Sequence, residues 1–481
     1  LRAVLTSASP STLVKRAAQS VPSVVKPSAV DLDPSGGVVR VPPCVDVLPT
    51  VLAGAARGPL LVCCPSIEQA TLLAARLRGT GVRVALLPRD WSIAAGGADV
   101  VIGARAAVWG PCLGLSAVMV LDEHDEAHQE ERSPTWHARD IAIERAQRSS
   151  VPCWLVSPSP SLEALAWAQM RVATPSRVEE RAGWPLIYLI DFSQSDAPVR
   201  SLLTRTVFDL CRDAQQRVVC VLNTKGRARR LVCQGCSSLV LCATCSAGVT
   251  QAADASLRCS RCDAERPPLC QACGSTRLVA VGTGVSRLRD ELERAVQRPV
   301  VEVSSDTPDG LVSQAPAGAV FLGTEAVLHR VSAATTVVFL DFDDELLAPR
   351  FRASEQAVAL LIRAARLVGG RAQGGRVVVQ TYQPKHEVLQ AVLHADPSRL
   401  VAVERERRRL LHFPPFAAVA AVTGALAGEW IGASDLQVSV SGPSKGRWLL
   451  RADDWETLAR ALSERGPRPR GVRVEVDPHR I

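Results

Sequence analysis

Eight cysteines, arranged as four Cys-x-x-Cys pairs, are the strongest chemical signal in the sequence. The pairs are Cys233/Cys236, Cys242/Cys245, Cys259/Cys262 and Cys270/Cys273. Two residues between the thiolates allow a tight turn to direct both sulfurs at one ion, and tetrahedral Zn²⁺ takes two such pairs. Eight ligands therefore predict two zinc ions per chain, in closed sites that hold local structure and leave no open position for a reacting water.

The spacing favours one pairing of these units and leaves others open. Thirteen residues lie between Cys245 and Cys259, which is close to zinc-ribbon spacing and long enough for a hairpin. We therefore expect an inner and an outer site. The inner site has Cys242, Cys245, Cys259 and Cys262, and the outer site has Cys233, Cys236, Cys270 and Cys273. The alternatives are sequential or crossed pairings, redox dithiols or an iron–sulfur cluster, although a redox pair usually occurs singly.

The cysteines interrupt a pattern of short apolar runs that alternate with helix-length segments. "GPLLVCCPS" and "SAVMVLDE" belong to a first series, and "QRVVCVLNTKG" and "GRVVVQTYQP" to a second. This alternation is typical of parallel sheets covered by helices, so we expect an α/β fold. The expected parts are a linker or remnant of a preceding domain at 1–44, a first lobe at 45–180, a second lobe at 181–231 and 274–400, the zinc-binding insertion at 232–273, and a small α+β C-terminal domain at 401–481.

Size and composition fit a protein of several domains. At 481 residues the chain exceeds what one core usually supports, and 47% apolar residues can build several cores. The sequence has no apolar run of about eighteen residues and no signal peptide, so we expect a cytoplasmic protein without a membrane partner. Because it begins at Leu1, a preceding segment remains open. The net charge of +8 permits contact with nucleic acid without requiring it.

A nucleotide-binding loop is missing from both lobes. A P-loop needs glycine-rich backbone and a lysine followed by Ser or Thr, which reach the phosphates and Mg²⁺. The five lysines are Lys15, Lys26, Lys225, Lys385 and Lys445, and they are followed by Arg, Pro, Gly, His and Gly. We therefore do not expect ATP or Mg²⁺ as cofactors.

A series of short motifs follows in order along the chain. In the first lobe these are "VVIGARAAVW" at 100–109, "LDEHDEAHQEERSPTWHARD" at 121–140 and "SPSPSLEA" at 157–164. "LNTKGRA" at 222–228 leads into the cysteines, and "LGTEAVLHR", "APRFRASEQAVALL", "VVVQTYQP", "HFPPF" and "VEVDP" come later. In this order they resemble the PriA (primosomal protein N′) family of replication restart helicases over nearly the whole chain. The resemblance implies two RecA-like helicase lobes, and a remnant of the family's DNA-binding and winged-helix region at 1–44.

The chain departs from this family where the family performs ATP hydrolysis. Leu121 stands where the family has its Mg²⁺-binding Asp, and Asp122 stands where it has the catalytic Glu. Leu367 and Gly370 stand at the two arginines of the last helicase motif, which would stabilise charge on the transferring phosphate. With the P-loop lysine also missing, the chain resembles actinobacterial-type members with degenerate helicase motifs. We expect no catalytic residues.

The resemblance implies a function in replication restart. The expected protein is monomeric and nucleoid-associated, binds DNA at stalled or branched forks and helps to load the replicative helicase, without ATPase or helicase activity of its own. Its expected partners are forked DNA, single-strand-binding protein, the replicative helicase and primosome components. The alternatives are an active ATP-dependent 3′→5′ DNA helicase of the same family and a zinc-stapled scaffold that binds only proteins.

Two short segments are candidate DNA contacts. Lys225 and Arg227 form a basic turn before the cysteines, and Trp136 and His137 lie in an aromatic loop of the first lobe. Basic side chains can meet phosphates, and aromatic rings can stack on bases. The alternative is that these residues are a solvated turn and a half-buried tryptophan.

Overall fold

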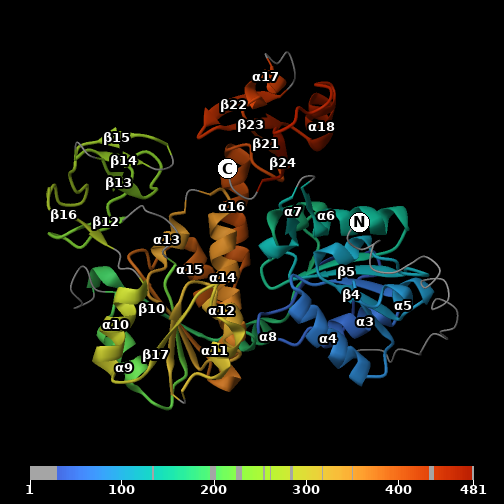
Figure 1. Cartoon of the computed structure of the whole chain (residues 1–481), viewed down its shortest axis with the longest axis horizontal. Helices are drawn as coiled ribbons and strands as arrows, with labels where there is room; N and C mark the ends of the chain where they lie inside the picture. Colours follow the sequence, from blue (N-terminus) through green and yellow to red (C-terminus); the bar gives the residue numbers. More distant parts are fainter. Residues whose placement is uncertain are drawn as a thin grey trace. The chain divides into compact units, whose positions relative to one another are not determined.

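A computed structural model of the chain shows two compact units (Figure 1). The first unit combines Leu1–Pro175 with Val401–Ile481, and the second is Ser176–Leu400. The structure describes residues 30–132, 135–194, 202–223, 230–252, 255–259, 262–281, 285–316, 318–348, 350–432 and 438–478. The predicted DNA contacts Lys225 and Arg227 lie outside these described residues.

A parallel sheet with the strand order β3-β4-β2-β5-β8-β1-β9 forms the centre of the first lobe. Its strands are β1 (Gly37–Arg40), β2 (Leu60–Cys63), β3 (Val84–Leu86), β4 (Val100–Gly103), β5 (Ala117–Leu121), β8 (Cys153–Ser157) and β9 (Val172–Ala173). Its helices are α3 (Leu48–Ala55), α4 (Ile67–Gly79), α5 (Trp91–Gly96), α6 (Ala138–Arg148) and α7 (Leu162–Trp167). Along β2, Leu60 and Val62 enter one core cluster while Leu61 and Cys63 enter another, because successive side chains of a strand face opposite sides of the sheet.

The first strand of this lobe lies before the boundary expected from the sequence. β1 pairs with β8 and β9 in parallel, with Val38 opposite Leu155 and Val172. Residues 37–40 are therefore part of the lobe-1 sheet and not of a linker. The prolines that follow β1 and its short length hide it in the sequence pattern.

The second unit has its own parallel sheet, with the strand order β10-β20-β19-β11-β18-β17. The strands are β10 (Leu186–Asp191), β11 (Val218–Val221), β17 (Val300–Val303), β18 (Val320–Gly323), β19 (Thr336–Phe339) and β20 (Arg376–Thr381). The helices are α8 (Arg177–Ala182), α9 (Arg205–Arg212), α10 (Val285–Val296), α11 (Asp309–Ser313), α12 (Val327–Arg330), α13 (Asp343–Leu346), α14 (Ala353–Val368) and α15 (Glu387–Leu393). This unit again has two cores, one on each face of the sheet.

The cysteine-rich segment is inserted between β11 and α10 of the second unit (Figure 1). Its base is an antiparallel pair, β12 (Arg230–Cys233) with β16 (Leu278–Val281). Between them lies a small antiparallel sheet of β13 (Val249–Gln251), β14 (Leu257–Cys259) and β15 (Glu265–Arg266).

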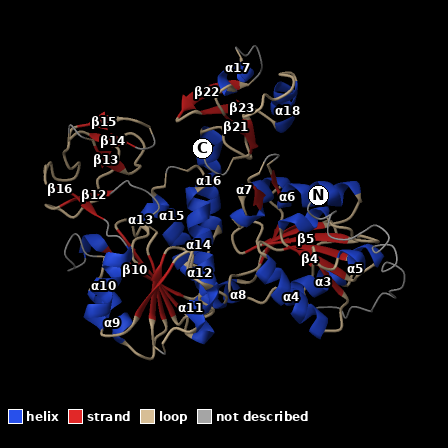
Figure 2. Ribbon diagram, in the orientation of Figure 1, coloured by secondary structure: helices blue, strands red, loops and turns tan. Residues whose placement is uncertain are grey.

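The C-terminal part follows the charged helix α16 (Ser398–Leu410). It is an antiparallel sheet with the order β22-β23-β21-β24 and two short helices (Figure 2). The strands are β21 (Ala418–Thr423), β22 (Ser439–Ser444), β23 (Arg447–Ala452) and β24 (Arg473–Val476), and the helices are α17 (Ala427–Ile431) and α18 (Trp455–Ser463).

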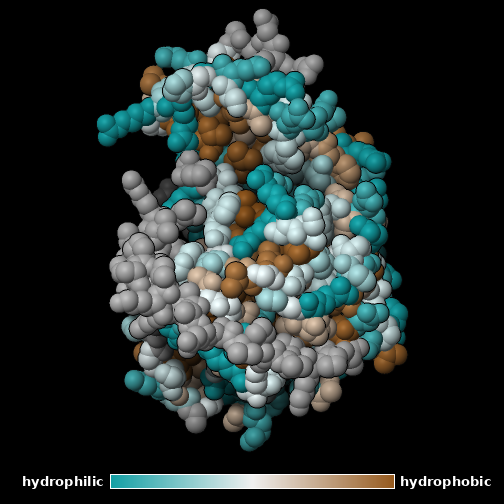
Figure 3. All heavy atoms as spheres, turned by 90° about the vertical axis from the view of Figure 1, so that its right-hand side faces the viewer, coloured by the Kyte–Doolittle hydropathy of each residue, from teal (hydrophilic) through white to brown (hydrophobic). Residues whose placement is uncertain are grey.

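The expected α/β fold class is confirmed, with two helix-covered parallel sheets, a cysteine-rich insertion in the second and a small α+β part at the end. Within the described residues, no helix combines the length and the apolar character needed to cross a membrane. On the face that Figure 3 shows, hydrophobic residues form small patches among hydrophilic ones.

Candidate functional site

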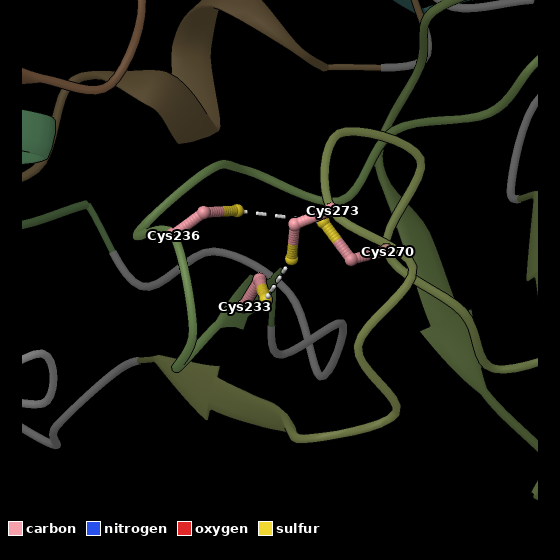
Figure 4. A group of neighbouring side chains, drawn as sticks. All are labelled: Cys233, Cys236, Cys270 and Cys273. Atoms are coloured by element: carbon pink, nitrogen blue, oxygen red, sulfur yellow. Dashed lines mark hydrogen bonds between the residues drawn. The ribbon is translucent and has the colours of Figure 1, made fainter.

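The eight paired cysteines gather into two groups of four sulfurs. One group is Cys233, Cys236, Cys270 and Cys273, and the other is Cys242, Cys245, Cys259 and Cys262. In each group all ligand atoms lie within 4.8 Å of one another. Figure 4 shows the four side chains of the first group, which converge from two turns at the base of the insertion. The grouping is the nested arrangement of an inner and an outer site.

A residue with left-handed backbone follows each Cys-x-x-Cys turn. These residues are Ser237, Ser246, Asp263 and Gly274, with φ between 54° and 72°. Three of the turns are also closed by a backbone hydrogen bond to the first cysteine, for example from Ser237 N to Cys233 O at 2.9 Å. The left-handed residue turns the chain back after the second cysteine, so that both sulfurs of a pair stay on the same side.

Backbone amides stabilise negative charge on several sulfurs. Gly235 N donates to Cys233 Sγ at 3.3 Å, and Thr244 N donates to Cys242 Sγ at 3.4 Å. The pKa of Cys236 falls to about 6, chiefly through its hydrogen bonds with Ser238. The pKa of Cys242 also falls to about 6, because amide hydrogen bonds outweigh the opposing effect of burial. The shifts differ within each group, since burial raises the pKa of Cys245 to about 12 and hydrogen bonds with Cys236 and Cys233 raise that of Cys273 to about 12. Thiolates are the form that binds metal, and the amide hydrogen bonds favour that form at Cys233 and Cys242.

The sulfur geometry fits a tetrahedral thiolate site. Cys233 Sγ lies 3.5 Å from Cys273 Sγ, and Cys245 Sγ lies 3.5 Å from Cys259 Sγ. Four sulfurs at about 2.3 Å from a zinc ion are about 3.8 Å apart, close to these distances. Disulfides would need about 2.0 Å. Four thiolates and no open position suit a structural Zn²⁺ and no hydrolytic chemistry.

A buried arginine joins the cysteine insertion to the sheet of its unit. Arg230, the first residue of β12, is only 7% exposed and forms ion pairs with Asp341, with Asp343 at 3.3 Å and with Asp344 at 2.7 Å. Asp343 also accepts hydrogen bonds from Thr381 Oγ1 at 2.6 Å and from Tyr382 N. The sequence pattern around Arg230 does not indicate this role, because the aspartates that pair with it lie far along the chain, after β19.

The loop after β1 occupies the position where a phosphate-binding loop would lie. β1, β8 and β5 are neighbours, so the loops at their carboxyl ends meet at the edge of a parallel sheet that usually binds ligands. Residues 41–47 contain Pro42 and Pro43, which have no backbone N–H to offer a phosphate. Asp46 accepts hydrogen bonds from Arg76 and from Leu48 N, and the Arg76 bond holds the pKa of its carboxyl below the usual range. Asp46 and Arg76 therefore form an exposed ion pair at this edge.

The acidic run after β5 is built into the interior of the lobe. Glu123 is fully buried and accepts hydrogen bonds from Ser161 N at 2.7 Å and Ser161 Oγ at 2.9 Å. Arg139 lies 3.5 Å from the same carboxylate. Burial raises the pKa of Glu123, against the lowering effect of Arg139 and Ser161. Both carboxylate oxygens are thus engaged inside the lobe.

Of the predicted aromatic contacts, Trp136 is partly exposed and His137 is buried. His137 begins α6 as its N-cap, with Nδ1 accepting a hydrogen bond from Arg139 N at 3.1 Å. Trp136 meets Trp109 edge to face, with ring centroids 5.7 Å apart, and Trp109 is 47% exposed. Trp109 ends the motif at 100–109, but nothing in that motif signals its contact with Trp136. The exposed ring of Trp109 can stack on a base, while Trp136 is half-buried against the lobe-1 core.

The chain matches curated proteins with one shared name. It is 28% identical over 346 residues to replication restart protein PriA of Bacillus subtilis, covering 67% of this chain and 43% of that protein. It is 29% identical over 430 residues to PriA of Treponema pallidum, covering 79% of this chain and 64% of that protein. The chain is a relative of PriA. No protein-family model matches it.

The similarity to PriA covers only part of the PriA sequences. The chain spans about half the length of the curated relatives it matches, between 43% and 64% for the two proteins above. Among solved structures, S. cerevisiae Dbp5 bound to RNA and ADP BeF3 superposes with a TM-score of 0.42 at 11% identity, covering 79% of this chain and 93% of that chain.

Three of the four departures from the PriA motifs, Leu121, Leu367 and Gly370, lie in apolar or backbone surroundings. Leu121 ends β5 and packs in the lobe-1 core. Leu367 lies on α14 and packs against the core of the second unit. Gly370 is in the turn after α14, where its carbonyl accepts a hydrogen bond from Gln373 N. Leu121, Leu367 and Gly370 of this chain can neither bind a metal ion nor place a positive charge beside a phosphate.

Proposed function

We propose that this chain is a PriA-type replication restart protein that binds stalled or branched forks and helps to load the replicative helicase without hydrolysing ATP. Its proposed partners are forked DNA, single-strand-binding protein, the replicative helicase and other primosome components. We propose that it acts as a monomer in association with the nucleoid. The relationship to PriA supports the DNA-binding role. The loop after β1 of the first lobe supports the loss of ATP hydrolysis.

The loop after β1 is the observation that supports the loss of ATP hydrolysis most directly. A phosphate site needs several N–H groups aimed at the ligand and a positive charge nearby. This loop has two prolines, and its carboxylate Asp46 already pairs with the Arg76 guanidinium. Pro42 and Pro43 offer no N–H to a polyanion, and Glu123 is engaged by Ser161 and Arg139.

The two groups of four cysteines are proposed as structural zinc sites. Their sulfur distances and the amide hydrogen bonds to Cys233 and Cys242 suit this ion. Bound zinc would fix the turns of the insertion and thereby its surface. The residues of the chain hold the ion, and no reaction step is assigned to it.

Trp136 and Trp109 are proposed to contact single-stranded bases at the fork. The exposed Trp109 ring meets the half-buried Trp136 ring on the first lobe, and the chain carries a net charge of +8. Lys225 and Arg227 stay predicted phosphate contacts from the sequence. The buried His137 has a structural position at the start of α6.

Binding to a fork is tested with the zinc-loaded chain and a labelled DNA fork that has a single-stranded arm. Fluorescence anisotropy at rising salt should show an affinity that falls roughly tenfold or more between about 50 and about 200 mM salt, because counterions are released from neutralised phosphates. Fork binding should exceed binding to a blunt duplex of the same length. Absence of salt-dependent binding would contradict the proposal and favour a scaffold that binds only proteins.

A further inference from the structure

A chain of buried polar contacts joins the first lobe to the C-terminal part within their shared unit. Arg408 of α16 is only 1% exposed. Its Nη1 lies 3.0 Å from Glu163 of α7 and donates to Pro414 O at 3.1 Å, while its Nε lies 3.1 Å from Glu404. Val401, near the start of α16, packs against the lobe-1 core. A buried guanidinium with several partners fixes the helix to the lobe in one geometry.

The same lobe surface leads directly to the aromatic pair. Ser161 caps α7, the helix that carries Glu163, and receives a hydrogen bond from Arg139 Nη1 at 3.0 Å. Arg139 is the second residue of α6, which begins immediately after Trp136 and His137. The strand β7 (Trp136–His137), which pairs with β6 (Gln129–Glu130), is therefore held at its end by the buried network.

The C-terminal sheet holds the other side of this strand pair. Thr135, the residue before Trp136, receives a hydrogen bond on Oγ1 from Val476 N at 2.8 Å and donates from Oγ1 to Val476 O at 3.4 Å. Arg473 Nη2 donates to the carbonyl of Glu131, which follows β6. Both contacts come from β24, the edge strand of the C-terminal sheet.

The position of Trp109 is tied to the same strand pair. Arg105 lies at the start of the 3₁₀ turn η1 (Arg105–Trp109). Its Nη2 pairs with Glu130 of β6 at 3.1 Å, and its Nη1 donates to Ala127 O. Trp109, at the end of that turn, then meets Trp136 edge to face.

We infer that the C-terminal part positions Trp136 and Trp109 for DNA, with Arg473 and Thr135 as positioning residues on opposite sides of the contact. This inference rests on the proposed function, since it assigns the geometry of the proposed base-stacking pair. The aromatic rings are presented by contacts that need no nucleotide, so the lobe and the C-terminal part bind DNA as one preorganised body. Preorganisation lowers the ordering that binding must impose on the rings.

The test removes the β24 contacts while leaving both rings in place. The double variant Arg473→Ala with Thr135→Val changes one exposed and one half-buried residue, and circular dichroism checks that the fold is retained. Arg470→Ala is the matched control, because it removes the same charge from an exposed residue just before β24. Amide hydrogen exchange of residues 129–131 and 135–137, and affinity for a fork with a single-stranded arm, are measured for the wild type and both variants.

The inference expects faster exchange in these segments of the double variant and a roughly three- to tenfold loss of fork affinity. The affinity of the double variant for a blunt duplex should change only as much as that of the Arg470→Ala control. Equal exchange and equal fork affinity in the double variant and the control would overturn the inference. A wild type that binds no fork overturns the proposed function itself, which separates the two failures.

Discussion

At the scale of residues, the cysteine turns share one regular geometry, whereas a position that differs from the PriA helicase motifs lies in the interior of the first lobe. Each Cys-x-x-Cys pair keeps the left-handed residue that closes its turn, such as Ser237 after Cys236. At the catalytic positions, Leu121 is buried among apolar side chains, and the neighbouring Glu123 is held by Ser161 and Arg139. The proposed zinc ligands thus share one turn geometry, while Leu121 faces the apolar core of the first lobe.

Substituting one cysteine per site tests the metal proposal at this scale. Cys242→Ser should reduce bound zinc from about two ions per chain to about one and lower the melting temperature, because a structural site loses one of four thiolates. Zinc is counted by elemental mass spectrometry on the purified chain. Cys112→Ser, a cysteine outside both groups, is the control. Unchanged zinc in Cys242→Ser would refute the inner site.

At the scale of elements, the insertion depends on one strand that belongs to two structures. β12 carries Arg230 at its first residue and Cys233 at its last. Its beginning is bound to the acidic residues after β19, and its end supplies a sulfur to the outer group. The strand therefore transmits the rigidity of the sheet to the cysteine turns.

Removing the buried guanidinium should destabilise the second unit. Arg230→Met leaves Asp341 and Asp343 buried without their cation, and breaking such an arrangement typically costs about 3–5 kcal/mol. Chemical unfolding of the zinc-loaded chain measures the loss. Arg258→Met, which removes an exposed ion pair with Glu265, should change stability by less than about 1 kcal/mol. Similar losses in both variants would show that Arg230 is not an anchor.

At the scale of the whole molecule, the sequence predicts features that depend on short spacing. Alternating apolar runs predict both parallel sheets, and the spacing of Cys245 and Cys259 indicates the inner group. Contacts between distant segments leave no such pattern. The ion pairs of Arg230 with its aspartates and the ring contact of Trp109 with Trp136 form only in the folded chain. β1 escapes detection because a four-residue strand followed by two prolines has too little periodicity.

We propose that this PriA relative binds forked DNA and does not hydrolyse ATP. The most direct measurement is phosphate release from ATP and Mg²⁺ by the zinc-loaded chain with saturating forked DNA. Asp122→Asn controls for contaminating ATPases, because Asp122 stands where the family has its catalytic Glu. We predict that the wild type releases phosphate no faster than this variant. Fork-stimulated turnover that Asp122→Asn abolishes would contradict the proposed loss of ATP hydrolysis.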